Sequence, residues 1–146
     1  MHSIRSASLE LILDAGNGSF SIHPVEERFP GLEQVRLGCE YLIGDAPVKG
    51  LTGSWKPGEM DESMLSTVEH GSIDLVSLQV PADGIGIAYT LSFGITREYP
   101  LVLWKVKLHN QGPRAVKVHR IDLVKINPEQ GSRMHLPRAK QPSEMG

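Results

Sequence analysis

The sequence has little cysteine, few aromatic residues and no long apolar run. Cys39 is the single cysteine of the 146 residues, which excludes an internal disulfide and a cysteine-based metal site. No apolar run approaches the roughly 20 residues of a membrane-spanning helix, and the first residues lack the apolar core of a secretory signal. We therefore expect a cytoplasmic protein without membrane contact, although a protein whose signal has been removed would look the same.

Neither sign of charge predominates. The chain contains 15 lysine and arginine residues against 17 aspartate and glutamate residues. Domains that bind nucleic acid carry a basic face that neutralises phosphate charge, and the sequence shows no such face. We therefore predict no nucleic-acid partner.

A sustained helical period is also missing. Fifteen glycines and ten prolines are distributed among short apolar runs, which favours an all-β chain. The closest approach to a helix is 59–68, where Met60, Met64, Leu65 and Val68 could line one side of a short helix. A loop with one turn fits this segment equally well.

Short runs in which apolar residues alternate with polar ones predict about eight or nine strands. The clearest runs are 9–13, 19–23, 33–43, 65–70, 72–80, 85–95, 101–109 and 115–126. A chain of this length makes one domain with a real core, and its strands need two layers to bury their apolar faces. We therefore predict an antiparallel β-sandwich, with a barrel as the alternative.

The last three runs predict a long antiparallel meander. With 96–99 as the first connection, Phe93 faces Val102, and the remaining pairs on that face of the sheet are also apolar against apolar. With 110–114 as the second connection, 115–126 pairs with 101–109. The apolar residues then change parity after Val118, which predicts a β-bulge near His119–Arg120.

The character of the chain changes after Asn127. Pro128, Pro137 and Pro142 interrupt a polar, basic-leaning segment that continues to Gly146. Such composition is typical of a linker or an extended surface arm. We therefore divide the chain into a sandwich domain, 1–127, and a proline-rich tail, 128–146.

No motif of catalysis or metal binding is recognisable. The histidines lack the helical spacing of zinc enzymes, and the carboxylates form no pair of the kind that a glycosidase holds across a sugar. Cys39 lies in an apolar run, where a buried inert thiol is the expected state. We therefore predict no catalytic residue, no cofactor and no metal ligand in this chain.

Trp55 and Lys56 are the candidate substrate-binding residues. They lie in the glycine- and proline-rich segment 50–58, from which a tryptophan beside a lysine could project and stack on a sugar ring or a partner surface. Alternatively, Trp55 folds back and caps the edge of the sandwich, which is the arrangement we favour. Trp104 differs, because its strand parity predicts a core position.

The region 85–123 resembles the N-terminal β-sandwich of α-galactosidases and raffinose-synthase-like enzymes, glycoside hydrolase family 36. The likeness rests on an alternating strand, Glu98-Tyr99-Pro100, a strand through Trp104, Asn110-Gln111-Gly112 and the valine-rich run Ala115–Leu123. That domain is a β-supersandwich related in shape to galactose mutarotase. In the family it precedes a catalytic (β/α)8 barrel, packs against it, shapes the rim of the active site and often supports oligomers.

The resemblance implies a non-catalytic accessory domain of an α-galactosidase-like enzyme, with a catalytic barrel or a homo-oligomer as partner. Lys125-Ile126-Asn127 is similar to the family's Lys-x-Asp nucleophile motif but has asparagine in place of the carboxylate, so it receives no catalytic role. Family members can reach a neighbour's active site with a loop tryptophan, for which Trp55 is a candidate. Two alternatives stay open: an independent module that binds carbohydrate or protein, and a small enzyme in which a histidine and a carboxylate meet in a concave sheet.

Overall fold

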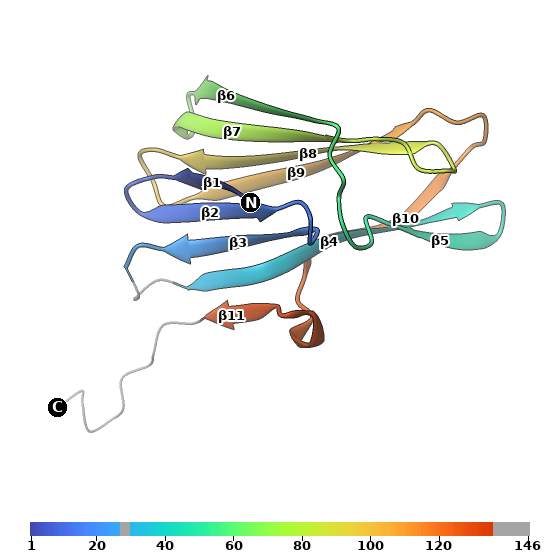
Figure 1. The fold of residues 1–146 in the computed structure, drawn as a ribbon. Coiled ribbons are helices and arrows are strands. Elements are labelled where there is room, and N and C mark those ends of the chain that lie inside the picture. The colour runs from blue at the N-terminus through green and yellow to red at the C-terminus, as the bar shows by residue number, and fades with distance from the viewer. Residues whose placement is uncertain (27–29, 136–146) are drawn as a thin grey trace.

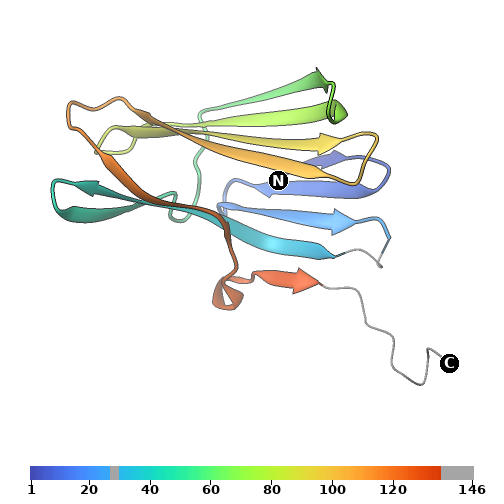
Figure 2. The ribbon, with the colours of Figure 1, turned by 180° about the vertical axis from the view of Figure 1, so that it is seen from behind.

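Two antiparallel sheets pack as a sandwich, which confirms the predicted fold class (Figures 1 and 2). The structure is a computed structural model that describes residues 1–26 and 30–135. Sheet A contains β1 (His2–Arg5), β2 (Leu9–Asp14), β3 (Ser19–Pro24), β4 (Gly31–Ile43), β5 (Ala46–Gly50), β10 (Lys117–Lys125) and β11 (Arg133–His135). Sheet B contains β6 (Glu59–Thr67), β7 (Gly71–Val80), β8 (Ile87–Thr96) and β9 (Val102–Asn110). A 3-10 turn, η1 (Pro128–Gln130), connects β10 to β11.

Strand β4 is the centre of sheet A. Its first half, residues 31–36, pairs with β3 and with β11. Its second half, residues 36–43, pairs with β5 and with β10. Because a strand has two edges, β5 and β10 lie on opposite sides of the second half of β4. This long strand therefore places residues from distant parts of the chain side by side.

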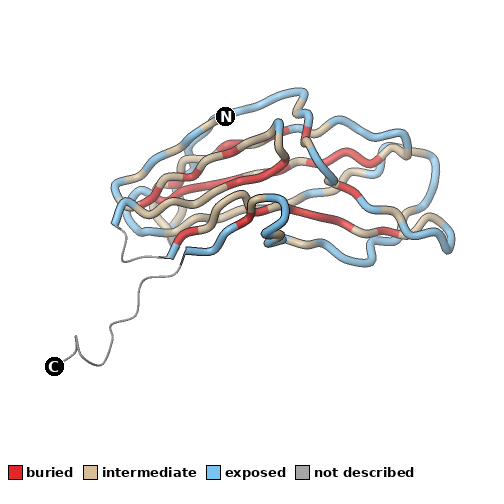
Figure 3. The backbone as a smooth tube through the Cα atoms, turned by 60° about the horizontal axis from the view of Figure 1, so that its bottom comes forward, coloured by how far each residue is buried: buried red, intermediate tan, exposed pale blue. Residues whose placement is uncertain are grey.

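The core is formed by alternate residues of the facing strands. Apolar burial is the main favourable contribution to such a fold, and Figure 3 shows the buried positions as stretches inside strands, with exposed positions at the connections. At its centre Phe20 of sheet A contacts Phe93 of sheet B, with ring centroids 5.3 Å apart. Trp104 lies 5.2 Å from Phe20 and is half-buried, so it packs against the core and is not sealed within it.

The predicted pairing of 85–95 with 101–109 has the correct faces but the wrong register. Phe93 lies opposite Trp104 and not opposite Val102, a difference of two residues. The cause is the connection: β8 continues to Thr96, whose backbone N–H donates to the Leu101 oxygen, so the turn spans 97–100. A shift of two residues keeps every side chain on its face, and the alternation alone therefore could not exclude it.

The predicted pairing of 115–126 with 101–109 is wrong. This run forms β10, which leaves sheet B and pairs with β4 of sheet A. The predicted bulge is nevertheless confirmed, because the register of β10 shifts between Val118 and Arg120. The change of parity belongs to the run itself, so the bulge was predictable without knowledge of its partner strand.

Two further segments differ from the sequence prediction. Residues 59–67, interpreted as a short helix or a loop, form the strand β6, which pairs with β7. Within the predicted tail, 133–135 form β11 and belong to sheet A, whereas 136–146 lie outside the described residues. No helix in the described part of the chain is long and apolar enough to cross a membrane.

Candidate functional site

Trp55 packs inside the sandwich, in the place expected if it caps the edge. Its side chain is 1% exposed and its ring stacks on Phe93, with centroids 5.8 Å apart. Its backbone N–H donates to the Ala15 oxygen at 3.0 Å, which ties the loop to the turn between β2 and β3. Lys56 is exposed. The predicted contact of Trp55 and Lys56 with a sugar stays a prediction, and stacking on the indole face would require the loop to move.

A hollow of about 390 Å³ opens beside this loop. Trp55, Lys56, Asp83 and Tyr89 are among the residues that line it. Trp55 Nε1 is buried and has no hydrogen-bond partner among the described residues, whereas the Tyr89 hydroxyl is buried beside the Tyr41 hydroxyl. Burial also raises the pKa of Tyr89, so its hydroxyl stays protonated at neutral pH. The unpaired indole N–H of a residue that lines the hollow is a feature that a ligand oxygen could satisfy.

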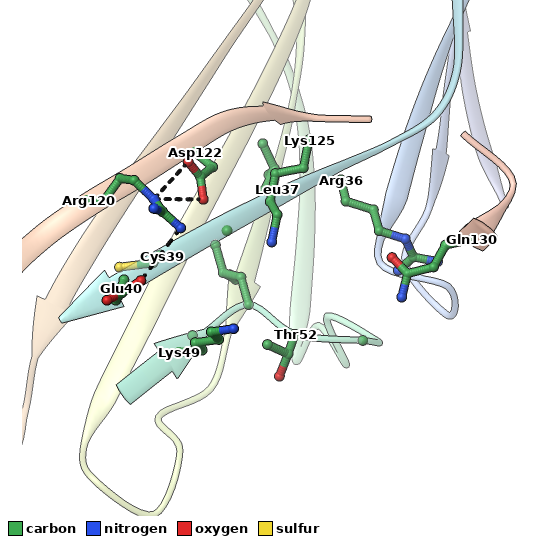
Figure 4. Close-up of a pocket in the computed structure, with 14 residues that line it drawn as sticks. Arg36, Leu37, Cys39, Glu40, Lys49, Thr52, Arg120, Asp122, Lys125 and Gln130 are labelled. Atoms are coloured by element: carbon green, nitrogen blue, oxygen red, sulfur yellow. Dashed lines mark hydrogen bonds and ion pairs between the residues drawn. The ribbon is translucent and has the colours of Figure 1, made fainter. Parts of the chain in front are cut away.

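A second hollow, of about 130 Å³, lies on the outer face of sheet A where β4, β5 and β10 meet (Figure 4). Four basic and two acidic side chains are among its lining residues: Arg36, Lys49, Arg120, Lys125, Glu40 and Asp122. Gly38 forms the floor, because a Cβ there would lie 2.8 Å from Lys125 Cδ and 3.2 Å from Asp122 Oδ2. The absence of a side chain at Gly38 therefore creates the space into which Lys125 and Asp122 extend.

Both carboxylates of the basic hollow are bound by the same arginine. Arg120 contacts Glu40 at 3.5 Å and Asp122 at 3.1 Å. Lys49 and Lys125 form no ion pair with any described residue, and both side chains are exposed. Neither lysine at the mouth of the hollow therefore has a partner carboxylate among the described residues.

Arg36 is held by a different group. Its guanidinium donates to the backbone oxygen of Asn17 at 2.7 Å and to the Asn17 side-chain oxygen at 3.0 Å, while Nε is buried without a partner. Amide oxygens orient a guanidinium but do not neutralise it. Arg36 thus forms no ion pair with a described residue, and its side chain extends away from Lys125 (Figure 4).

An apolar strip is exposed along β10 and the residues that follow it. We define the β10 strip as Val118, Ile121, Leu123, Val124 and Ile126, whose side chains are between 38 and 47% exposed. Val118 and Ile121 lie opposite Tyr41 and Cys39, which are core residues of β4. The inner side of β10 therefore continues the core face of sheet A beyond the edge of sheet B, whose last strand is β9.

Comparison with known proteins gives no relative. No protein-family model matches the chain, and no curated protein or solved structure matches it. The resemblance to family 36 therefore rests on the residues quoted from the sequence alone.

The remaining side chains that could take part in catalysis or metal binding are the Cys39 thiol and the histidines. Cys39 is 4% exposed, and burial raises its pKa, with a smaller contribution from the Asp122 charge, so the thiol is a poor nucleophile. His109 lies opposite Ala88, and its Nε2 is 3.1 Å from Thr90 Oγ1. The described residues contain no group of three or more histidine, cysteine or acidic side chains that could hold a metal ion.

The residues of the basic hollow were not identified from the sequence. Their outward direction on β4 is readable, since Arg36, Gly38 and Glu40 alternate with the buried Leu37 and Cys39. Their neighbours were not readable, because β5 was interpreted as irregular and β10 was assigned to the other sheet. Charged and hydrogen-bonding side chains of this kind are the groups that hold and orient a small anionic ligand.

Proposed function

We propose that this chain is a non-catalytic accessory domain that packs through the β10 strip against a catalytic barrel of the α-galactosidase type. The observation that carries the proposal is the exposure of five large apolar side chains on one strand and its continuation. Contiguous exposed apolar surface of this kind marks sites of interaction. The class of the partner follows from the family-36 resemblance of 85–123.

The position of the strip supports the packing of a neighbouring domain against it. Across the edge of the sandwich, the Trp104 side chain of β9 reaches β10, where Nε1 donates to the Leu123 oxygen at 2.9 Å. This one contact leaves Val118 and Ile121 half uncovered. A domain that packs on the strip would complete the burial that sheet B begins, and each side chain fully buried would contribute about 1.5–3 kcal/mol.

The experiment is a domain exchange. Residues 1–146 replace the N-terminal sandwich of a family-36 α-galactosidase, and hydrolysis of p-nitrophenyl α-galactoside is compared with that of the barrel alone and of the intact enzyme. We expect the chimaera to exceed the barrel alone by at least about tenfold, since a docked sandwich stabilises the barrel and its rim. A chimaera no better than the barrel alone, beside an active intact enzyme, rejects the proposal.

Two charge insertions test whether the strip is the contact. Ile121→Asp and Leu123→Asp place a carboxylate on the strip, and Val68→Asp places one in the fully exposed turn between β6 and β7. We expect the two strip variants to lower the activity of the chimaera to that of the barrel alone, because a buried unpaired charge is strongly unfavourable. The Val68 variant should keep the higher activity. Equal activity of all three chimaeras would show that the strip does not make the contact.

A second candidate function, an independent carbohydrate-binding module, is favoured by the unpaired Nε1 of Trp55, a residue that lines a hollow of about 390 Å³. In a Trp104→Phe variant the fluorescence comes from Trp55 alone. A saturable fluorescence change on titration with galactose would support sugar binding at this hollow. A flat titration with galactose and with raffinose would leave the accessory-domain proposal as the better account.

A further inference from the structure

The basic hollow combines side chains that are far apart in the sequence. Across the three strands Lys49 lies opposite Glu40, and Glu40 lies opposite Arg120. One row further, Gly38 lies opposite Asp122, and then Arg36 lies opposite Lys125. The first row contains two basic residues and one acidic residue. In the last row both residues are basic, but their side chains diverge: Arg36 binds Asn17, whereas Lys125 extends over Gly38 (Figure 4).

The basic side chains that line the hollow outnumber the carboxylates by four to two. Both carboxylates, Asp122 and Glu40, form ion pairs with Arg120, and neither forms one with Lys49 or Lys125. The chain as a whole has a formal net charge of −2, so this concentration of positive charge does not reflect a basic protein. An anion bound in the hollow would supply the ion-pair partner that Lys49 and Lys125 lack.

The shape of the hollow fits a small anion. Figure 4 shows Lys125 extending from β10 over β4, with Lys49 and Thr52 on the opposite side. Its volume of about 130 Å³ admits a single compact group, since a water molecule takes about 30 Å³. The Thr52 hydroxyl and the Gln130 amide line the same space and can donate hydrogen bonds to oxygens.

We propose that this hollow is a binding site for a tetrahedral oxyanion, a phosphate or sulfate group, held by Lys49 and Lys125. Charge-assisted hydrogen bonds from ammonium and guanidinium groups to such oxygens are short and strong. The site lies on the outer face of sheet A, and it does not depend on what packs against the β10 strip. A ligand that carries this group on a sugar or another small molecule would be anchored here by its charge.

The test uses inorganic phosphate and the full chain. Backbone amide resonances of Gly38, Gly50 and Gly53 are followed by NMR while phosphate replaces chloride at constant ionic strength and pH. We expect shifts that saturate below about 10 mM phosphate, the range of a small-ion site. A parallel titration with sulfate distinguishes the two sources, and the tighter ion identifies the group that the natural ligand carries.

Matched lysine variants distinguish phosphate binding in the hollow from a general attraction of phosphate to positively charged side chains. Lys49→Gln with Lys125→Gln should weaken phosphate binding by at least about tenfold, because both ammonium donors are lost. Lys105→Gln with Lys107→Gln removes the same charge from exposed positions of β9 and should change affinity by less than about twofold. Shifts that stay linear in phosphate, or equal losses in the two double variants, would overturn the proposal. Circular dichroism confirms that each variant is folded.

Discussion

The indole N–H of Trp104 on β9 donates a hydrogen bond to the backbone oxygen of Leu123 on β10, with 2.9 Å between the two atoms. The two strands belong to different sheets, and the chain crosses from one to the other between them. The same tryptophan contacts Phe20 of sheet A with its ring. Trp104 therefore joins the sheets at the edge where sheet B ends.

Replacement of Trp104 by phenylalanine should weaken this junction. The ring contact with Phe20 is largely kept, but the hydrogen bond to Leu123 is lost, and the expected loss in the free energy of unfolding is about 1–2 kcal/mol. Urea denaturation followed by circular dichroism measures it. Tyr99→Phe is the control, because Tyr99 is 52% exposed and its hydroxyl forms no hydrogen bond with the described residues. Equal midpoints for the wild type and Trp104→Phe would contradict the structural role.

Gly18 and Gly44 form a matched pair for backbone strain. Both have a left-handed backbone, with φ of +68° and +60°. A Cβ at Gly18 would lie 1.8 Å from the Gly53 oxygen, whereas a Cβ at Gly44 would meet nothing within 4 Å. Gly44→Ala should therefore lower the free energy of unfolding by about 1–2 kcal/mol, from backbone strain alone. Gly18→Ala should lower it by at least about 3 kcal/mol, because the Trp55 loop must also move away.

Thermal unfolding of the two glycine variants provides the measurement. The prediction concerns the difference between them, which isolates the contact of the β2–β3 turn with the Trp55 loop. If Gly44→Ala proves as destabilised as Gly18→Ala, that contact contributes nothing. Acrylamide quenching of Trp55 adds a second readout, since displacement of the loop in Gly18→Ala should raise its accessibility.

Asp74 and Arg97 predict a defined response to acid. Arg97 binds both carboxylate oxygens of Asp74, at 2.9 and 2.7 Å, and these hydrogen bonds lower the pKa of Asp74. A carboxyl whose pKa is lower in the folded state contributes stability above its unfolded pKa, about 3.9, and that stability is lost as the pH falls through the folded value. Arg97→Gln should therefore raise the pKa of Asp74 toward its ordinary value.

NMR titration of the Asp74 carboxyl carbon tests this shift directly. The stability difference between wild type and Arg97→Gln should be present at neutral pH and disappear in acid, below the folded pKa of Asp74. Arg5→Gln breaks a looser pair with Glu10, at 3.4 Å, and should leave Asp74 unchanged. An unchanged Asp74 titration in Arg97→Gln would show that the ion pair does not persist in solution.

The strand faces were predictable because side-chain alternation is a local property. The positions of Leu11, Phe20, Leu91 and Phe93 in the core follow from the period of two alone. The same local signal located the bulge at His119, since the change of parity is visible in the sequence of 115–126 itself. The predicted register between β8 and β9 was wrong by two residues, because alternation cannot distinguish registers in which every side chain stays on the same face of the sheet.

The candidate sites depended on long-range pairing, which alternation does not encode. The basic hollow exists because β5 and β10 flank the second half of β4, and no feature of Lys49 or Lys125 predicts that they share a neighbour. The β10 strip was missed for the same reason: its two valines, two isoleucines and one leucine belong to the run that was predicted to pair with 101–109. Trp55 was ambiguous for another reason, since a loop tryptophan can point outward or inward and only the stacking on Phe93 decides between them.

Cys39 should be inert in the native state and reactive after unfolding. Its side chain is 4% exposed on β4, and burial, with a smaller contribution from the Asp122 charge, raises its pKa, so both access and thiolate formation are suppressed. Reaction with a disulfide reagent such as DTNB should be slow in buffer and complete in denaturant. A Val68→Cys variant supplies an exposed thiol that should react at once in buffer. Rapid labelling of native wild-type protein would mean that the segment of β4 between β5 and β10 opens readily, and the floor of the basic hollow would then not be rigid.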